Sequence, residues 1–173
     1  MEALHTIEKQ LAPLFKDLPA IPKGFKDFLV QYWPYIALFL GVVQLFAAWS
    51  LFALVSFASS VINYANTVSV YTGQPVGYTG LELTAAWVGI AVLVVNAIIF
   101  IVAFSPLTKK AKRGWDLLFL ATLINAVYGL TQVFISVRGF GGLLSSLVGT
   151  AIGLYLLFQI RDRYTAKKAA KTS

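Results

Sequence analysis

The chain has 173 residues, a formal net charge of +7, 58% hydrophobic residues and only 12% charged residues. Soluble domains contain about 45–50% apolar and about 25% charged residues, so this composition excludes an ordinary soluble globular protein. The chain contains no cysteine, which excludes disulfides, thiolate catalysis and cysteine-bound metal.

Two long stretches carry no charged side chain, one from Phe28 to Gly80 and one from Leu83 to Thr108. A helix of about 20 apolar residues crosses a hydrocarbon core of about 30 Å. The sequence therefore predicts an all-α membrane protein with four transmembrane helices and an N-terminal amphipathic helix. The predicted spans are about 32–61, 81–104, 115–137 and 143–160. They lie in a transmembrane domain over 28–160, after a cytoplasmic or interfacial segment 1–27 and before a basic cytoplasmic tail 161–173.

The N-terminal segment shows apolar residues at helical spacing, interrupted by charged ones. They are Leu4, Ile7, Leu11, Leu14, Phe15 and Leu18. This spacing predicts a helix with one apolar face, which Pro13 is expected to bend or break. Such a helix either lies flat among lipid headgroups or covers the cytoplasmic ends of the other helices. A turn over 18–24, which contains Pro19 and Pro22, leads into the first span.

The first span begins with an aromatic belt at Tyr32, Trp33 and Tyr35. It is longer than a bilayer requires, so it must tilt or project beyond the membrane. Residues 63–80 are uncharged and contain three tyrosines with glycine and proline, and an irregular cap over the outer ends of the helices is expected. The second span is expected to stop at Ser105-Pro106.

The basic residues predict the orientation, because Lys and Arg accumulate on the cytoplasmic side. Arg138 alone falls on the outer side. The sequence thus predicts a multi-pass protein of the cell (inner) membrane with both termini cytoplasmic. Anionic lipids at the cytoplasmic face are the expected partners, and nucleic acid is not. The basic residues assigned to the cytoplasmic side are Lys9, Lys16, Lys23, Lys26, Lys109, Lys110, Lys112, Arg113, Arg161, Arg163, Lys167, Lys168 and Lys171.

Three amides, Gln44, Asn96 and Asn125, are the polar side chains expected deep in the spans. Each lies about nine or ten residues from the cytoplasmic end of its helix, which places all three about 14 Å deep, near the midplane. They indicate either hydrogen bonds between helices or a site for a small neutral or zwitterionic solute, and we favour the first interpretation.

Charged and small residues at the edges of the spans suggest structural roles. Glu82 and Arg138 form a possible external ion pair, and Asp116 in the first turn of the third span would complement the helix dipole. His5 is the only histidine, and we expect it to be exposed and not to bind metal. In the fourth span, the small residues Ser145, Gly149 and Gly153 recur every four positions and predict a helix-packing face, within the bundle or toward a partner.

The stretches Arg113–Phe119, Leu123–Gly129 and Gly149–Arg161 resemble small uncharacterised bacterial four-helix membrane proteins, and the region Tyr32–Trp49 is similar to them more loosely. That resemblance implies a four-helix bundle and brings no activity with it. The layout is also similar to DoxX-type proteins, but the glycine and charge pattern of their first helix is absent here, so no DoxX function is carried over.

The sequence contains no recognisable set of acid, base, nucleophile or metal ligands, so no catalytic residue and no cofactor are predicted. We therefore expect a non-enzymatic accessory or structural subunit that acts through helix–helix contacts. Its partners would be further copies of the chain, in a homo-oligomer, or other membrane subunits. The alternative is a small oligomeric transporter or channel for a neutral or zwitterionic solute, which would use the amide layer.

Overall fold

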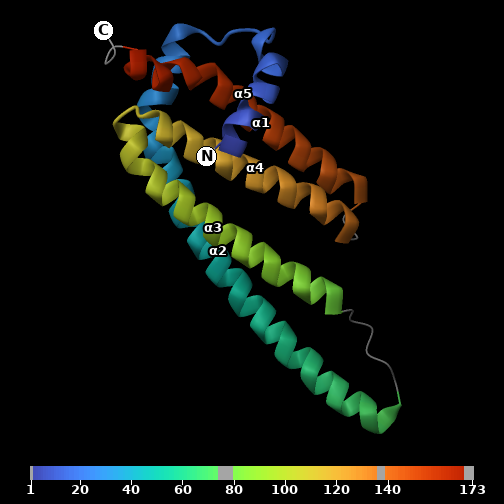
Figure 1. Ribbon diagram of the computed structural model, residues 1–173. Helices are drawn as coiled ribbons and strands as arrows, with labels where there is room; N and C mark the ends of the chain where they lie inside the picture. Colours follow the sequence, from blue (N-terminus) through green and yellow to red (C-terminus); the bar gives the residue numbers. More distant parts are fainter. Residues whose placement is uncertain (1, 74–79, 136–138, 170–173) are drawn as a thin grey trace.

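The computed structural model describes residues 2–73, 80–135 and 139–169, and these residues are helical with short connections and no strand (Figure 1). This agrees with the all-α prediction. The five helices are α1 (Glu2–Lys16), α2 (Lys23–Thr72), α3 (Gly80–Thr108), α4 (Lys112–Ile135) and α5 (Gly139–Ala169).

Among the described residues, three helical segments are long and apolar enough to cross a membrane: Lys23–Ser69, Leu83–Thr108 and Lys112–Thr131. They indicate a membrane protein. The predicted fourth span, 143–160, lies within α5, and the side chains of its first residues are outside the described part of the chain.

The helices pack mainly in chain order, α2 against α3, α3 against α4 and α4 against α5. Figure 1 shows the α2–α3 and α4–α5 hairpins diverging from a common end, so the arrangement is open. At that end α1 crosses α4 and α5, and α2 makes a few contacts with α5.

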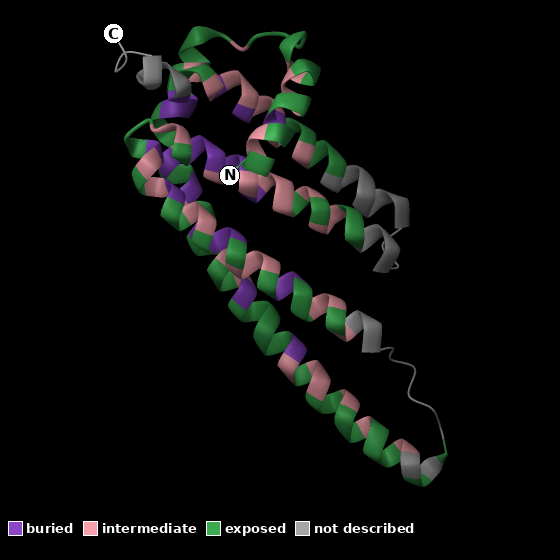
Figure 2. Ribbon diagram, in the orientation of Figure 1, coloured by how far each residue is buried: buried purple, intermediate pink, exposed green. Residues whose placement is uncertain are grey.

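The main hydrophobic core occupies this common end, where buried residues gather in Figure 2. Trp115 and Phe119 of α4 lie at its centre and are almost completely buried. The Trp115 ring stacks on Phe119 and meets Phe158 of α5 edge to face. The Trp115 Nε1 donates a 2.7 Å hydrogen bond to the Leu157 carbonyl, which satisfies the polar atom of this buried ring.

Two glycines allow α3 to approach its neighbours closely, Gly114 on α4 and Gly41 on α2. A Cβ atom added to Gly114 would lie 2.8 Å from the Leu107 backbone nitrogen. A Cβ atom added to Gly41 would lie 3.1 Å from the Ala97 carbonyl oxygen. Any larger residue at Gly114 would therefore push α3 and α4 apart, because backbone atoms cannot move aside as a flexible side chain can.

The prediction of an irregular cap from residue 63 is wrong for residues 63–72, which continue α2. The hydroxyl groups of this segment bond to its own backbone carbonyls. Thr67 Oγ1 donates to the Asn63 carbonyl at 2.9 Å, and Ser69 Oγ donates to the Asn66 carbonyl at 2.8 Å, so these polar residues are accommodated within a helix. The helix ends at Gly73, whose φ of 68° is the left-handed conformation that glycine readily adopts.

Pro13 was expected to bend or break its helix, and Ser105-Pro106 was expected to end the second span. The structure includes Pro13 within α1 and Pro106 within α3, so α1 is continuous and α3 extends past Ser105 to Thr108. The remaining residues of the predicted cap, 74–79, lie outside the described part of the chain.

Candidate functional site

A buried carboxylate on α1 is the centre of the strongest polar cluster among the described residues. Glu8 is only 3% exposed. Arg161 of α5 donates from Nε to Glu8 Oε1 at 2.6 Å, and Lys112 of α4 donates from Nζ to Glu8 Oε2 at 3.1 Å. His5 Nδ1 lies 3.0 Å from Glu8 Oε2. The cluster therefore joins α1, α4 and α5.

The helices hold this cluster at the edge of the main core. Lys112 begins α4 and also bonds Asp116, one turn further on, at 3.0 Å. Its ammonium group lies 5.0 Å from the centre of the Trp115 ring, an additional cation–π contact. Two turns further along the same face of α1, Phe15 stacks on Phe158 with ring centres 4.9 Å apart.

The electrostatic environment keeps Glu8 ionised. Burial raises the pKa of the Glu8 carboxyl, but the hydrogen bonds from His5, Lys112 and Arg161, together with the charge of Lys112, outweigh burial and lower that pKa below its usual 4.5. A charged Glu8 therefore ties α1 to the bundle.

Three residues of this cluster, His5, Glu8 and Asp116, carry side chains that can bind a metal ion. Their ligand atoms lie within 4.8 Å of one another. The Lys112 ammonium bridges the two carboxylates at 3.1 and 3.0 Å, and the Arg161 guanidinium adds a second positive charge. Two carboxylates are thus already balanced by two cations. The arrangement serves a structural ion-pair network better than a metal site.

This cluster departs from two expectations. His5 is partly buried and bonded to Glu8, whereas we expected it to be exposed. Asp116 lies beyond the first turn of α4, because that helix begins at Lys112, and it pairs with Lys112 instead of the free helix terminus.

One more ion pair, Asp27 with Arg163 at 2.8 Å, joins α2 and α5 at the same end.

The role of Glu8 was not predicted from the sequence, although the spacing of this residue carries a signal. Leu4, Leu11 and Phe15 pack against the main core, and Glu8 occupies the remaining position of the stripe 4, 8, 11, 15. Ile7 and Leu14, which we assigned to the apolar face, are 38% and 68% exposed. A charged residue on the inward stripe of a helix indicates a buried partner of opposite charge.

Two of the three predicted intramembrane amides are brought together. Asn96 of α3 is fully buried, and its Nδ2 donates to Asn125 Oδ1 of α4 at 2.9 Å. The Oδ1 of Asn96 and the Oε1 of Gln44 are buried without a hydrogen-bond partner in the described part of the chain.

The predicted packing face of α5 is placed only in part. Gly149 is exposed, and an added Cβ atom would meet nothing within 4 Å. Gly153 faces Thr122 of α4 at an ordinary contact distance of 3.8 Å. The side chains of Ser145 and Glu82, and all of Arg138, lie outside the described residues. The packing face and the external ion pair therefore stay predictions.

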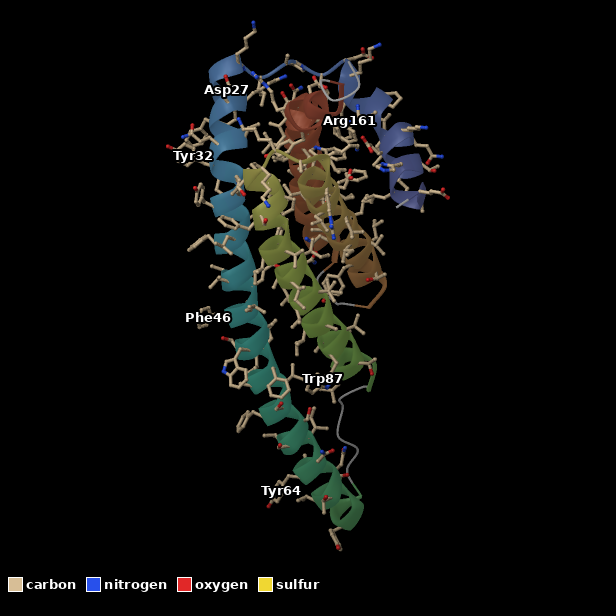
Figure 3. All side chains as sticks on the ribbon, turned by 60° about the vertical axis from the view of Figure 1, so that its left-hand side comes forward. Asp27, Tyr32, Phe46, Tyr64, Trp87 and Arg161 are labelled. Atoms are coloured by element: carbon tan, nitrogen blue, oxygen red, sulfur yellow. The ribbon has the colours of Figure 1, made fainter. Side chains whose placement is uncertain are left out.

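The outward face of α2 is apolar along most of its length. Tyr32, Phe46 and Tyr64 lie on the side facing away from α3, and Trp87 marks the α3 side (Figure 3). The side chains of Phe46, Trp49 and Phe57 are 70%, 72% and 70% exposed. Beyond Val55, no described side chain of α2 is buried.

Comparisons with known protein families, curated proteins and solved structures find no match.

Proposed function

We propose that the chain is a non-enzymatic, four-span protein of the inner membrane that serves as an accessory or structural subunit and acts through helix–helix contacts. The observation that carries this proposal is the outward face of α2. A helix that buries one face on α3 and presents large aromatic residues along the other offers an extended surface to lipid and to further helices.

The proposed topology is supported by the position of the charges. Lys112, Arg161 and Arg163, from α4 and α5, form ion pairs at the end of the molecule where α1 lies. These ion pairs gather at one end of long apolar helices, which supports a cytoplasmic side that holds both termini and supports α5 as the fourth span. The Glu8 cluster supports α1 as an amphipathic helix that covers this end.

A groove of about 650 Å³ between α1 and α5 supports the expected contact with anionic lipid. Lys9, Lys16 and Lys26 lie around it, and Phe15 and Phe158 contribute apolar surface. A phosphate headgroup with acyl chains combines the same two chemistries, negative charge and apolar surface.

The alternative function, a small oligomeric transporter of a neutral or zwitterionic solute, is favoured by one observation. Asn96 Oδ1 and Gln44 Oε1 are buried acceptors without a partner in the described part of the chain, so a donor from a water molecule or a solute would satisfy them. The Asn96–Asn125 bond favours the structural interpretation of the same residues.

Native mass spectrometry of the protein extracted gently from its own membrane tests the proposal. We expect a complex of several chains, which weakens when Phe46 and Trp49 are both replaced by alanine. Val127→Ala is the matched control, because Val127 is an exposed apolar residue, 62% accessible, on α4. A monomer that retains one small ligand would overturn the proposal and favour the transporter.

A further inference from the structure

The outer part of α2 extends farther than a bilayer requires. The helix has 50 residues, which corresponds to about 75 Å at 1.5 Å per residue. Starting at Leu29, next to the Asp27–Arg163 ion pair, a helix tilted by 20–40° needs about 21 to 26 residues to cross a 30 Å core. The hydrocarbon region would then end near residues 50–55. The segment after Phe57 therefore projects beyond it.

Composition supports this boundary. Polar uncharged residues become frequent from Ser56 onward and include Ser59, Ser60, Asn63 and Asn66. Trp49 of α2 lies just before this change in composition. Phe52 stacks on Trp49 and meets Trp87 of α3 edge to face, so the three rings form one aromatic group. Tryptophan residues gather at the membrane–water interface, so this aromatic group fits the outer interface.

The projecting segment, together with the helical turn before it, nevertheless carries a regular apolar stripe. The steps between its members are three, four, three, four and three residues, which is the heptad spacing of a coiled coil. All six side chains are substantially exposed on α2. They are Leu54 (62%), Phe57 (70%), Val61 (49%), Tyr64 (74%), Val68 (41%) and Tyr71 (85%).

Lipid cannot cover this stripe where the helix leaves the hydrocarbon core, so another protein surface is the physical alternative. A heptad repeat specifies an α-helix as that surface. The α3 helix is already used on the other side of α2, where Leu83 and Ala86 pack against the cluster that contains Val55.

We infer that a second copy of this chain covers the stripe, so that the outer parts of two α2 helices pair in parallel along Leu54–Tyr71. This inference rests on the proposed function and specifies the partner of the α2 surface. Copies inserted in one membrane share one orientation, so their stripes run in the same direction and at the same height. Anchoring in a common bilayer also raises the effective concentration of the two helices.

The residues beside the stripe favour a second copy over an unlike partner. Charged residues at these flanking positions normally select the partner of a coiled coil. Here Ala58, Ser60, Ala65 and Thr67 are small and uncharged, so two identical helices meet no like-charge repulsion and approach closely. Val61 and Val68 place β-branched residues at alternate core layers, a choice that favours parallel two-stranded pairing.

Disulfide crosslinking in native membranes tests the inference, and the chain suits it because it contains no cysteine. Val61→Cys and Tyr64→Cys place thiols on the stripe. Asn63→Cys and Asn66→Cys are the controls, since both are exposed on other faces of the same segment. In a parallel pair, we expect oxidation to give covalent dimers at positions 61 and 64 with at least about tenfold higher yield than at 63 and 66, because only stripe thiols come within bonding distance.

Equal yields at all four positions would indicate random collisions and would overturn the inference, as would the absence of dimers at every position. A bifunctional maleimide supplies a second measurement on the same variants. Adducts of the Val61→Cys and Tyr64→Cys proteins with a different polypeptide would also overturn the second copy as partner, while leaving the proposed function intact. Failure of the proposed function appears separately, as a ligand-bound monomer in native mass spectrometry.

Discussion

The two ends of α2 lie in very different surroundings. Near Val30, α2 belongs to the common end of the bundle, where Trp115 and Phe119 are buried and the Glu8 ion pairs bind three helices together. Near Tyr64, the same helix has no buried side chain among its described residues. The first end is held by contacts within the chain. The second end exposes its apolar residues, so the contacts that stabilise the chain and the surface proposed for association lie in different parts of one helix.

The largest expected effect comes from comparing two tryptophans. Trp115→Ala removes a ring that is 1% exposed, together with its hydrogen bond to Leu157, and should lower the free energy of unfolding by about 3–5 kcal/mol. Trp49→Ala removes a ring that is 72% exposed and should cost less than about 1 kcal/mol. Equilibrium denaturation in detergent measures both. Similar losses for the two variants would show that the described core does not dominate stability.

A smaller effect is expected at the Glu8 cluster. Glu8→Gln keeps the size of the side chain but removes the charge that pairs with Lys112 and Arg161, and should weaken the docking of α1 by about 1–3 kcal/mol. Hydrogen exchange of the α1 amides should rise accordingly. Glu2→Gln is the control, because Glu2 is exposed at the start of the same helix. Unchanged exchange in Glu8→Gln would contradict a docking role for this carboxylate.

The pH dependence of α1 follows from the same residue. The pKa of Glu8 is lowered from 4.5, because its hydrogen bonds and the charge of Lys112 outweigh the opposing effect of burial. Its contribution is therefore complete above pH 4.5 and is lost as the pH falls through the lowered pKa. Exchange of α1 should increase over that acidic range in the wild type. In Glu8→Gln this step should be absent, and a step of equal size there would assign it to another group.

The sequence predicted the helical class and long apolar helices that suit a membrane, because long apolar runs without charge have few structural solutions. It did not predict that residues 63–72 stay helical, because Ser, Thr and Asn are turn formers unless their side chains bond to the preceding helical turn, as those of Thr67 and Ser69 do here. The Glu8 cluster was not predicted either, because Glu8 is more than 100 positions away in sequence from both Lys112 and Arg161. Only the fold brings these residues together.

Hydrogen bonds between helices at the amide layer, in contrast, were expected from the equal depth of these residues, and the Asn96–Asn125 pair allows the smallest expected effect to be measured. A double-mutant cycle with Asn96→Leu and Asn125→Leu should give a coupling free energy of about 0.6 kcal/mol, the average for a hydrogen bond between membrane helices. Thermal unfolding in detergent of the single and double variants provides the values.

Gln44→Leu supplies the control for that cycle, since Gln44 Oε1 has no hydrogen-bond partner in the described part of the chain. Its coupling to Asn125 should be close to zero if the amide layer only joins α3 to α4. A coupling between Gln44 and Asn125 as large as that between the two asparagines would mean that all three amides share one network, which a bridging water or solute would have to complete. That result would favour the transporter over the structural subunit, because a network closed by an exchangeable molecule is the arrangement that a solute site requires.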